Sequence, residues 1–397
     1  MQLTHLSLSN FRNFARLDLP VPAGATLVVG ANAQGKTSLL EAVYFLATLS
    51  SFHAENDRQL VNFIEARNPT AVARIVANYQ RGEREHQMEV RIIQEQTKLG
   101  QRARKEVLLD GSKLKVGEAV GHFNAVLFLP QMLQIIDSAP RHRRRYLDLA
   151  LSQVQPHYSE HLSEYESILS QRNALLKQIS EGGGERSQLD FWDERLSLRG
   201  AQVLAARFQA LKELDEMAGR IHHELTRGAE VLRLSYQPSY DPLPGNGSQR
   251  TLMEAPPDRS GISVDKLQAG FHEALAARRG EEIARGVTSI GPHRDELRFL
   301  GNSLDLGSYG SRGQVRTTLL TLKLAEMEWM QARSGRWPVL LLDEVLAELD
   351  EARRADLLGR LSQDRQVLLT TTDVDLFTNE FLAGAERWDI ESGQLKS

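Results

Sequence analysis

The chain has 397 residues, no cysteine and a formal net charge of -4 at pH 7. The lack of cysteine excludes disulfides, thiolate catalysis and Cys-ligated metal centres, and the acidic total means that DNA binding would need a local basic patch. The length predicts two or three domains. No basic segment followed by an apolar core opens the sequence, and no uncharged apolar stretch could span a bilayer. We therefore expect a cytoplasmic protein that is not a membrane permease.

The first residues predict two strands joined by a turn. Residues 3–9 alternate apolar and polar side chains, as a half-buried strand does, and residues 17–19 begin a second strand. Arg12 and Asn13 lie in the turn between them. Either these two side chains lie near a bound nucleotide, or the turn only packs its phenylalanines into the core.

Residues 30–37 fit the phosphate-binding pattern G-x-x-x-x-G-K-[ST] at every fixed position. The β-branched, apolar run 26–29 precedes them and a helical pattern follows, so backbone N–H groups and a positive helix end point at one place. We predict that a nucleotide's phosphates bind there, with Lys36 on the β- and γ-phosphates and the Thr37 hydroxyl on Mg²⁺. The other predicted cofactor-binding residues of this segment are Gly30, Ala31, Asn32, Ala33, Gln34, Gly35 and Ser38.

An antiparallel β layer is predicted after the first helix. Residues 71–79, 89–93 and 107–112 read as strands. The basic run 101–105 is typical of a solvated loop, with DNA contact as the alternative. The apolar run 124–129 predicts a buried strand. Gln131 follows its tip and is a candidate for facing Mg²⁺ or the attacking water.

A cationic cluster and a helical arm come next. Residues 140–148 include arginines that suit phosphate oxygens and equally suit internal carboxylates. Apolar heptads over 158–179 and a second pattern over 189–225, with Arg172 breaking the first stripe, predict two antiparallel helices. The Pro- and Gly-rich stretch 237–261 predicts a long loop, and helix returns at 264–283.

The C-terminal part supplies a second group of candidates. His293 and Arg294 follow a Gly-Pro turn, which is either a solvated turn or part of a site. Ser311 is a good N-cap for an apolar helix over 315–330, and Gly313 allows close approach of a ligand.

Residues 338–342 form an apolar run that ends in two acids, Asp343 and Glu344. The tip of a strand in a parallel sheet is where ligands bind. We predict that Asp343 holds Mg²⁺ and that Glu344 polarises the water that attacks the γ-phosphate. Residues 367–373 predict one more core strand with a polar end.

These elements, in this order, resemble the ATP-binding-cassette heads of the SMC-type DNA-repair ATPases. The Walker B strand is 339–344, the D-loop is 346–350, and the signature is Ser311, Arg312, Gly313 and Gln314. The short arm, together with segments 8–14, 140–148, 291–295 and 370–373, is similar to the bacterial recombination proteins of this family. The resemblance implies an α/β fold, an ABC-type P-loop ATPase head with an added antiparallel β layer and a mainly helical arm. Its segments would be 1–140 and 286–397 for the head and 141–285 for the arm.

The resemblance also implies a mechanism. The chain would be a weak DNA-dependent ATPase that binds ATP and Mg²⁺ and closes as a homodimer, with the signature residues Ser311, Gly313 and Gln314 of one copy meeting the ATP of the other. The dimer would clamp duplex DNA near single-strand gaps and, with RecO and RecR, help load RecA, and hydrolysis would release the DNA. Two positions depart from transporter cassettes: Arg312 replaces a glycine, and Thr372 stands where those proteins carry a switch histidine.

The sequence also allows two alternative functions. The chain could be a cassette subunit acting on a transporter or on translation, but the helical arm and the arginine cluster argue against that. It could be a scaffold that no longer hydrolyses ATP, but intact Lys36, Thr37, Asp343 and Glu344 argue against decay.

Overall fold

The computed structural model describes residues 1–54, 56–97, 100–243, 257–361 and 365–396. The chain divides into two compact units, the first made of Met1–Met132 and Glu326–Ser397 and the second of Leu133–Ala325. The segment boundaries at 140 and 285 stay a prediction. Residues 244–256 of the predicted long loop lie outside the described residues.

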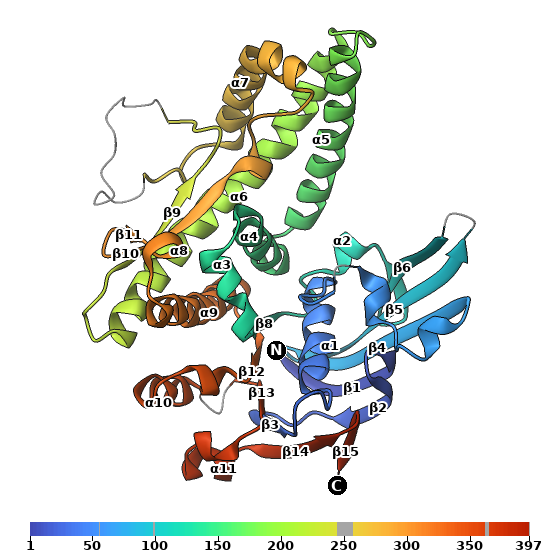
Figure 1. The fold of residues 1–397 in the computed structure, drawn as a ribbon, viewed down its shortest axis with the longest axis vertical. Coiled ribbons are helices and arrows are strands. Elements are labelled where there is room, and N and C mark those ends of the chain that lie inside the picture. Colours follow the sequence, from blue (N-terminus) through green and yellow to red (C-terminus); the bar gives the residue numbers. More distant parts are fainter. Residues whose placement is uncertain (55, 98–99, 244–256, 362–364, 397) are drawn as a thin grey trace. The chain divides into compact units, whose positions relative to one another are not determined.

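The first unit contains an antiparallel sheet of six strands in the order β2-β1-β4-β5-β6-β7 (Figure 1). This is the antiparallel layer expected from the alternating segments. Its strands are β1 (Gln2–Phe11), β2 (Phe14–Pro20), β4 (Thr70–Arg81), β5 (Arg84–Thr97), β6 (Gly100–Leu109) and β7 (Ser112–Leu114).

The basic run 101–105 lies in strand β6 and not in a solvated loop. It pairs with β5 in continuous register. Two of its cations have carboxylate partners: Arg104 Nη1 lies 2.5 Å from a Glu106 oxygen on the same strand, and Lys105 Nζ lies 3.2 Å from Asp57 Oδ2 in the short helix 57–60. The composition of this run suggested a loop, because the sequence shows its positive charges but does not show the carboxylates that neutralise them.

A second sheet in the first unit has the order β15-β14-β3-β13-β12-β8, and all of its pairings are parallel except that of β15. Asp343 pairs with Thr370, and Thr371 pairs with Val29. The carboxyl ends of the central strands therefore share one edge, which is where ligands bind in such sheets. The strands are β3 (Ala25–Val29), β8 (Ala125–Phe128), β12 (Val339–Asp343), β13 (Val367–Thr371), β14 (Glu386–Glu391) and β15 (Gln394–Lys396).

Helix α1 (Lys36–Thr48) packs against β8, β12 and β13 of the parallel sheet and against β4 of the antiparallel one. Leu39, Leu40 and Phe45 have no exposed surface, as expected of a helix covered on all sides. The packing fixes the start of α1 at the edge of the parallel sheet. The other helices of this unit are η1 (Asp57–Leu60), η2 (Glu65–Arg67), α2 (Val116–Ala119), η3 (Pro130–Leu133), η5 (Val345–Glu348), α10 (Glu351–Arg360), η6 (Val374–Leu376) and α11 (Asn379–Gly384).

The second unit is mainly helical. Its arm helices α5 (Tyr158–Ser180) and α6 (Gln188–Leu225) agree with the two predicted helices, and α7 (Val264–Arg285) packs on both, so the arm is a three-helix bundle. Within the described part of the chain, none of the helices combines the length and apolarity that a bilayer crossing requires. The remaining helices are α3 (Gln134–Asp137), α4 (Pro140–Val154), η4 (Pro292–Arg294), α8 (Leu306–Tyr309) and α9 (Arg312–Ser334), the last of which continues into the first unit.

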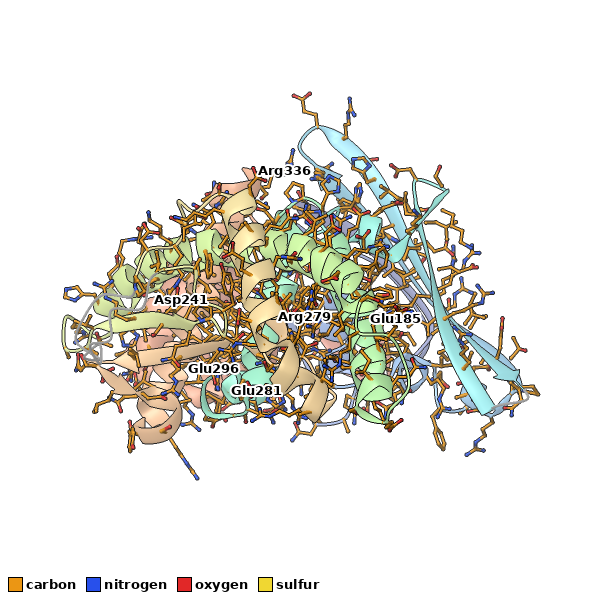
Figure 2. The ribbon with its side chains drawn as sticks, turned by 90° about the horizontal axis from the view of Figure 1, so that it is seen from above. Glu185, Asp241, Arg279, Glu281, Glu296 and Arg336 are labelled. Atoms are coloured by element: carbon orange, nitrogen blue, oxygen red, sulfur yellow. The ribbon has the colours of Figure 1, made fainter. Side chains whose placement is uncertain are left out.

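Arg172 interrupts the apolar stripe of α5 because the bundle has a charged centre. Its guanidinium lies 2.7 Å from Asp193 on α6 and 2.7 Å from Glu282 on α7, and all three side chains have no exposed surface. Arg279 of α7, labelled in Figure 2, pairs with the other oxygen of Asp193 at 2.6 Å. A buried charge is tolerated only when it is paired in this way.

A small sheet of the second unit, in the order β11-β10-β9, was not predicted. It consists of β9 (Leu232–Gln237), β10 (Glu296–Gly301) and β11 (Leu304–Asp305). The alternation of apolar and polar residues in β9 was a usable signal, but its partner β10 lies far along the chain.

Candidate nucleotide site

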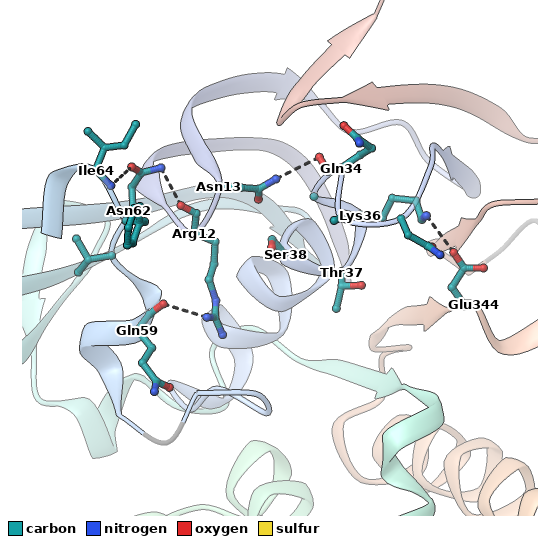
Figure 3. Close-up of a pocket in the computed structure, with 15 residues that line it drawn as sticks. Arg12, Asn13, Gln34, Lys36, Thr37, Ser38, Gln59, Asn62, Ile64 and Glu344 are labelled. Atoms are coloured by element: carbon teal, nitrogen blue, oxygen red, sulfur yellow. Dashed lines mark hydrogen bonds and ion pairs between the residues drawn. The ribbon is translucent and has the colours of Figure 1, made fainter.

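The phosphate loop lies between β3 and the start of α1, at the carboxyl edge of the parallel sheet, and lines a pocket of about 630 Å³ (Figure 3). A volume of this order suits a small ligand or cofactor. The pocket is lined by Arg12, Asn13, Asn32, Ala33, Gln34, Gly35, Lys36, Thr37, Ser38, Gln59, Val61, Asn62, Phe63, Ile64 and Glu344.

The loop's backbone conformation depends on two residues with positive φ. Ala33 has φ 63° and Gly35 has φ 115°. A Cβ on Gly35 would lie 2.6 Å from Asn13 Nδ2, so glycine is required there. Successive N–H groups in such a turn, at the start of a helix, form a concavity that favours an anion.

Lys36 reaches back across the loop and is 5% exposed. Its Nζ donates to Gly30 O at 2.7 Å and to Ala31 O at 3.2 Å. It also lies 3.0 Å from Glu344 Oε1, as Figure 3 shows. Phosphate oxygens entering the pocket would compete with the Glu344 carboxylate for this amine, because both are anionic acceptors.

Thr37 and Asp343 contribute oxygens to the same point. Thr37 Oγ1 donates to Asp343 Oδ2 at 2.8 Å, and Thr370 Oγ1 donates to Asp343 Oδ1 at 2.6 Å. These hard oxygen donors fit Mg²⁺, which is typically held by one or two protein oxygens while water and substrate phosphates complete its shell. Among the described residues, no group of three or more His, Cys, Asp or Glu side chains could hold a metal ion without such help.

Glu344 has an unusual backbone conformation. Its φ is 53°, in the left-handed region, and its N–H donates to Thr370 O at 3.3 Å. Non-glycine residues in this region gather at functional sites. Thr372 N–H donates to Glu344 Oε2 at 3.3 Å, and the Thr372 hydroxyl lies 3.5 Å from it. The residue at the position of the transporter switch histidine therefore contacts the candidate catalytic acid.

Arg12 and Asn13 line the pocket but have different partners. The Arg12 guanidinium makes two hydrogen bonds to Glu41, at 2.7 and 2.8 Å, and a third to Gln59 O at 3.0 Å. Asn13 Nδ2 donates to Gln34 O at 3.2 Å. The Asn13 side chain therefore holds the phosphate loop by its hydrogen bond to Gln34. The Arg12 side chain connects the turn between β1 and β2 to α1.

Gln131 is exposed in η3, just beyond β8, the strand beside β12. It is not among the described residues that line the pocket. Its role at the metal or the attacking water stays a prediction.

The C-terminal hairpin also supports the phosphate loop. This contact was not predicted from the sequence. In the turn between β14 and β15, Ser392 N–H donates to Gln34 Oε1 at 2.5 Å and Gly393 N–H donates to Gln34 O at 3.0 Å. The Ser-Gly pair between two short runs was a usable hairpin signal. The segment from Gln59 to Ile64 was missed as well, because nothing in its mixed composition shows that it faces the pocket.

The signature residues belong to the second unit, at the start of α9. Gln314 N–H donates to Ser311 Oγ at 3.2 Å, which confirms Ser311 as a cap. Gly313 is exposed, and a Cβ placed on it would lie 4.0 Å from Ser311 Oγ, the one close atom in the described part of the chain. The backbone at this helix start is therefore open to a ligand.

The arginine cluster is divided between the interior and the surface. Arg143 makes two hydrogen bonds to Glu296, at 2.7 and 2.9 Å, and Arg144 donates to the backbone oxygen of Asp295 at 2.8 Å. These two therefore have the internal partners that were one of the alternatives. Arg141 and Arg145 are exposed, and phosphate contact by them stays a prediction.

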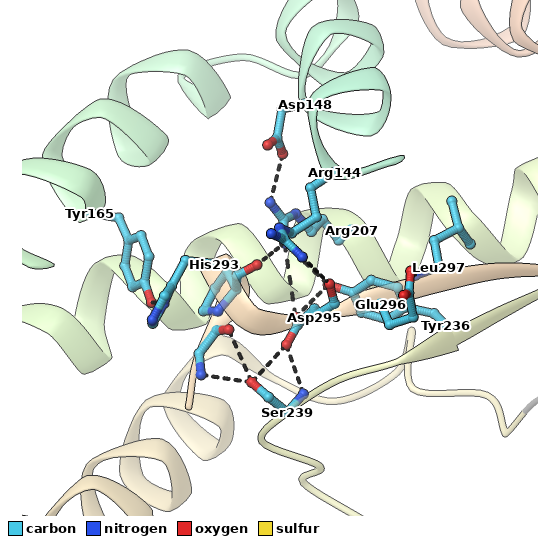
Figure 4. Close-up of polar contacts among 12 residues, drawn as sticks. Arg144, Asp148, Tyr165, Arg207, Tyr236, Ser239, His293, Asp295, Glu296 and Leu297 are labelled. Carbon is cyan, nitrogen blue, oxygen red and sulfur yellow. Dashed lines mark hydrogen bonds and ion pairs between the residues drawn. The ribbon is translucent and has the colours of Figure 1, made fainter. Parts of the chain in front are cut away.

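The turn that holds His293 and Arg294 packs into a buried polar network in the second unit (Figure 4). Arg207, 2% exposed, donates to Asp148 at 2.8 Å and to Pro292 O at 2.7 Å. The side chain of Asp295 is fully buried, and burial raises its pKa although Arg207 opposes the shift.

His293 Nδ1 lies 2.6 Å from the Tyr165 hydroxyl. Burial lowers the pKa of His293 to about 4, because the protein interior disfavours the charged ring. The contact of His293 with Tyr165 joins the turn to α5, whereas Arg294 is exposed to solvent.

Comparisons with known proteins agree with this geometry. Residues 2–384 match the model of the family described as RecF/RecN/SMC N-terminal domain. A protein of Chloroflexus aurantiacus named DNA replication and repair protein RecF is 41% identical over 406 residues, which cover 100% of this chain and 99% of that protein.

Two solved structures are similar to this chain. That of the recombination mediator protein RecF with ATP, of the RecFOR pathway, is similar with a TM-score of 0.84 at 30% identity, covering 100% of this chain and 97% of that one. An Smc head bound to the C-terminal winged-helix domain of ScpA aligns with a TM-score of 0.51 at 15% identity, over 100% of this chain and 96% of that one, which shows a shared fold alone. The predicted fold class, an ABC-type ATPase head with an added β layer and a helical arm, is confirmed.

Proposed function

This chain belongs to the RecF/RecN/SMC N-terminal domain family, and from that premise we propose that it is an ATP-driven DNA clamp of recombinational repair. ATP closes two copies on duplex DNA near a single-strand gap, and hydrolysis opens them again. Its relative with ATP bound, at 30% identity over nearly the full length of both chains, supports ATP as the nucleotide.

The observation that carries the proposal is a pair of contacts across the pocket. The Thr37 hydroxyl lies 2.8 Å from Asp343, and the Lys36 amine lies 3.0 Å from Glu344. These are the four side chains that phosphoryl transfer needs near the terminal phosphates. They come from distant segments of the chain and meet at one edge of the parallel sheet, where Lys36, Thr37 and Glu344 line the pocket and Asp343 contacts Thr37.

Each residue has a role in this mechanism. The N–H groups of the loop bind phosphate oxygens, and Lys36 leaves Glu344 to contact the β- and γ-phosphates. Thr37 and Asp343, with Gln131 proposed as a third ligand, would hold Mg²⁺, which neutralises charge on the phosphates. Glu344, freed from Lys36 and oriented by Thr372, accepts the proton of the attacking water.

The site is completed by a second copy of the chain. Ser311, Gly313 and Gln314 begin a helix whose N–H groups can bind an anion, and we assign them to the ATP of the partner copy. Arg12 and Asn13 support the loop in its own copy. We further propose that the clamp acts in the cytoplasm and, with RecO and RecR, helps to load RecA; the similar structure named for the RecFOR pathway supports the choice of RecO and RecR.

The alternatives fit less well. A transport or translation cassette would not be expected to match a DNA replication and repair protein over 99% of that protein's length. A scaffold without hydrolysis would have no need for the Lys36–Glu344 and Thr37–Asp343 contacts.

A gel-shift experiment with gapped duplex DNA tests the proposal. We expect binding with ATP and much weaker binding with ADP or without nucleotide. Glu344→Gln should hold the DNA longer in ATP than the wild type does. Equal binding in all three nucleotide states would contradict the clamp.

A further inference from the structure

A continuous chain of hydrogen bonds joins the start of α9 to the end of α6 within the second unit. Its first link is reciprocal: Gln314 N–H donates to Ser311 Oγ at 3.2 Å, and Ser311 N–H donates to Gln314 Oε1 at 3.0 Å. This is a capping box. It uses the oxygen of the Gln314 amide and leaves the NH₂ group for another partner.

That partner is a carboxylate at the end of the turn that follows α6. Gln314 Nε2 donates to Glu230 Oε1 at 3.0 Å. The other oxygen of Glu230 lies 3.2 Å from His222 Nε2, and the His222 side chain has no exposed surface. Glu230 is itself held by its backbone, since its N–H donates to Thr226 Oγ1 at 3.3 Å.

The second nitrogen of His222 connects this chain of hydrogen bonds back to α9. Nδ1 lies 3.0 Å from Thr321 Oγ1, and the single hydroxyl proton of Thr321 goes to Thr317 O at 2.8 Å. Each ring nitrogen of His222 therefore has an oxygen within hydrogen-bond distance, Thr321 Oγ1 for Nδ1 and Glu230 Oε2 for Nε2.

We propose that Glu230 and His222 are positioning residues for the signature, and that Gln314 acts mainly as the link between them and Ser311. Each donor in the chain has one acceptor, so the orientation of the Gln314 amide is fixed by its two neighbours. The inference rests on the proposed function only for what Ser311 does in the dimer, and not for how Ser311 is held.

The identity of residue 314 gives a sharp test. Gln314→Glu keeps the acceptor for Ser311 N–H but turns the donor toward Glu230 into a second carboxylate, so the two acids would repel each other. Adding Glu230→Gln reverses the donor and acceptor: the new amide oxygen accepts from His222, and its NH₂ donates to residue 314. The double variant therefore restores every hydrogen bond of the chain.

The measurement is amide hydrogen exchange of the full-length, nucleotide-free protein, followed over residues 307–318. We expect exchange about tenfold faster in Gln314→Glu, because one hydrogen bond to a charged group is replaced by repulsion. The single variant Glu230→Gln should show a smaller increase. In the double variant the rate should return to within about twofold of the wild type.

A matched control is Glu281→Ala on α7, a residue labelled in Figure 2 that forms an ion pair with Arg285 on the same helix at 3.1 Å. It should not change exchange over residues 307–318. Wild-type exchange in both single variants, or a double variant no slower than Gln314→Glu, would overturn the inference.

ATP-driven dimerisation, measured by sedimentation on the same proteins, separates the inference from the proposed function. We expect Gln314→Glu to weaken dimerisation about tenfold and the double variant to recover part of the loss, because the carboxylate at residue 314 still lies beside the partner's phosphates. If the wild type does not dimerise with ATP, the proposed function fails while the exchange data still decide the positioning role. Intact dimerisation in a variant whose exchange is accelerated would contradict the importance of the positioning.

Discussion

Thr37 Oγ1 lies 2.8 Å from Asp343 Oδ2, although 306 positions separate the two residues in the sequence. The parallel sheet makes this possible, because β3 leads into the loop of Thr37 and β12 ends on Asp343 at the same edge. The contact joins the two segments that the nucleotide site needs.

Lys36→Ala should weaken ATP binding by about a hundredfold, because the variant loses the cation that contacts the β- and γ-phosphates. The Lys36 side chain is almost fully buried against the loop carbonyls of Gly30 and Ala31, which fixes the position of its charge. Fluorescence titration with a labelled ATP analogue measures the affinity. Unaltered affinity would mean that the loop is not the nucleotide site.

Gly393→Ala should weaken ATP binding through the loop it supports. The residue has φ 73°, and a Cβ would lie 2.8 Å from Asn13 O. The hairpin would have to move and loosen its hold on Gln34, and we expect about a tenfold loss of affinity. Gly82→Ala is the matched control, with φ 68° and no atom of the described residues within 4 Å of a Cβ.

Both glycine variants should lose about 1 kcal/mol of stability from the left-handed conformation. Only Gly393→Ala should change the affinity for ATP. Equal affinities in the two variants would show that the hairpin does not support the loop.

Ser311→Arg should abolish ATP-driven dimerisation, because a long cation would block the helix start that meets the partner's ATP. It also removes the cap of α9, a loss of about 1 kcal/mol. Ser311→Asp separates the two effects, since aspartate can cap the helix but repels phosphate. We expect both variants to remain monomeric with ATP when their mass is measured by light scattering. Dimerisation of Ser311→Asp at the wild-type level would mean that the signature is misassigned.

Acid should destabilise the second unit through His293. Its pKa is about 4 in the folded protein and 6.5 in the unfolded chain, so unfolding takes up a proton between these values. Stability from this group is complete above pH 6.5 and falls as the pH drops toward 4, by about 3 kcal/mol in total. Denaturant unfolding of the wild type and of His293→Gln at pH 7 and pH 5 measures it. The variant should lose less stability at pH 5, and equal losses would show that His293 does not titrate in this way.

Much of the fold could be predicted from local patterns in the sequence. The spacing around Lys36, the apolar run before Asp343 and the heptads of the arm each follow from one short stretch, so the strand, loop and helix assignments could be made without knowing the fold. Because ligands bind at the carboxyl ends of the strands in a parallel sheet, the phosphate loop and the two acids could then be predicted to lie at the same edge.

Contacts between distant residues could not be predicted in this way. Nothing near Arg172 indicates that Asp193 and Glu282 surround it, and nothing near Gln34 shows that a turn at Ser392 binds it. Composition also assigned the basic run of β6 to a loop. Burial and pairing of polar groups depend on the tertiary structure, which single stretches do not encode.

Sedimentation velocity of Glu344→Gln with ATP tests the central claim most directly, because this variant should bind ATP but fail to activate the attacking water. We predict a stable dimer with ATP and a monomer with ADP or without nucleotide, while the wild type returns to monomer as ATP is consumed. A monomer in all three conditions would contradict the composite site and with it the ATP-driven clamp.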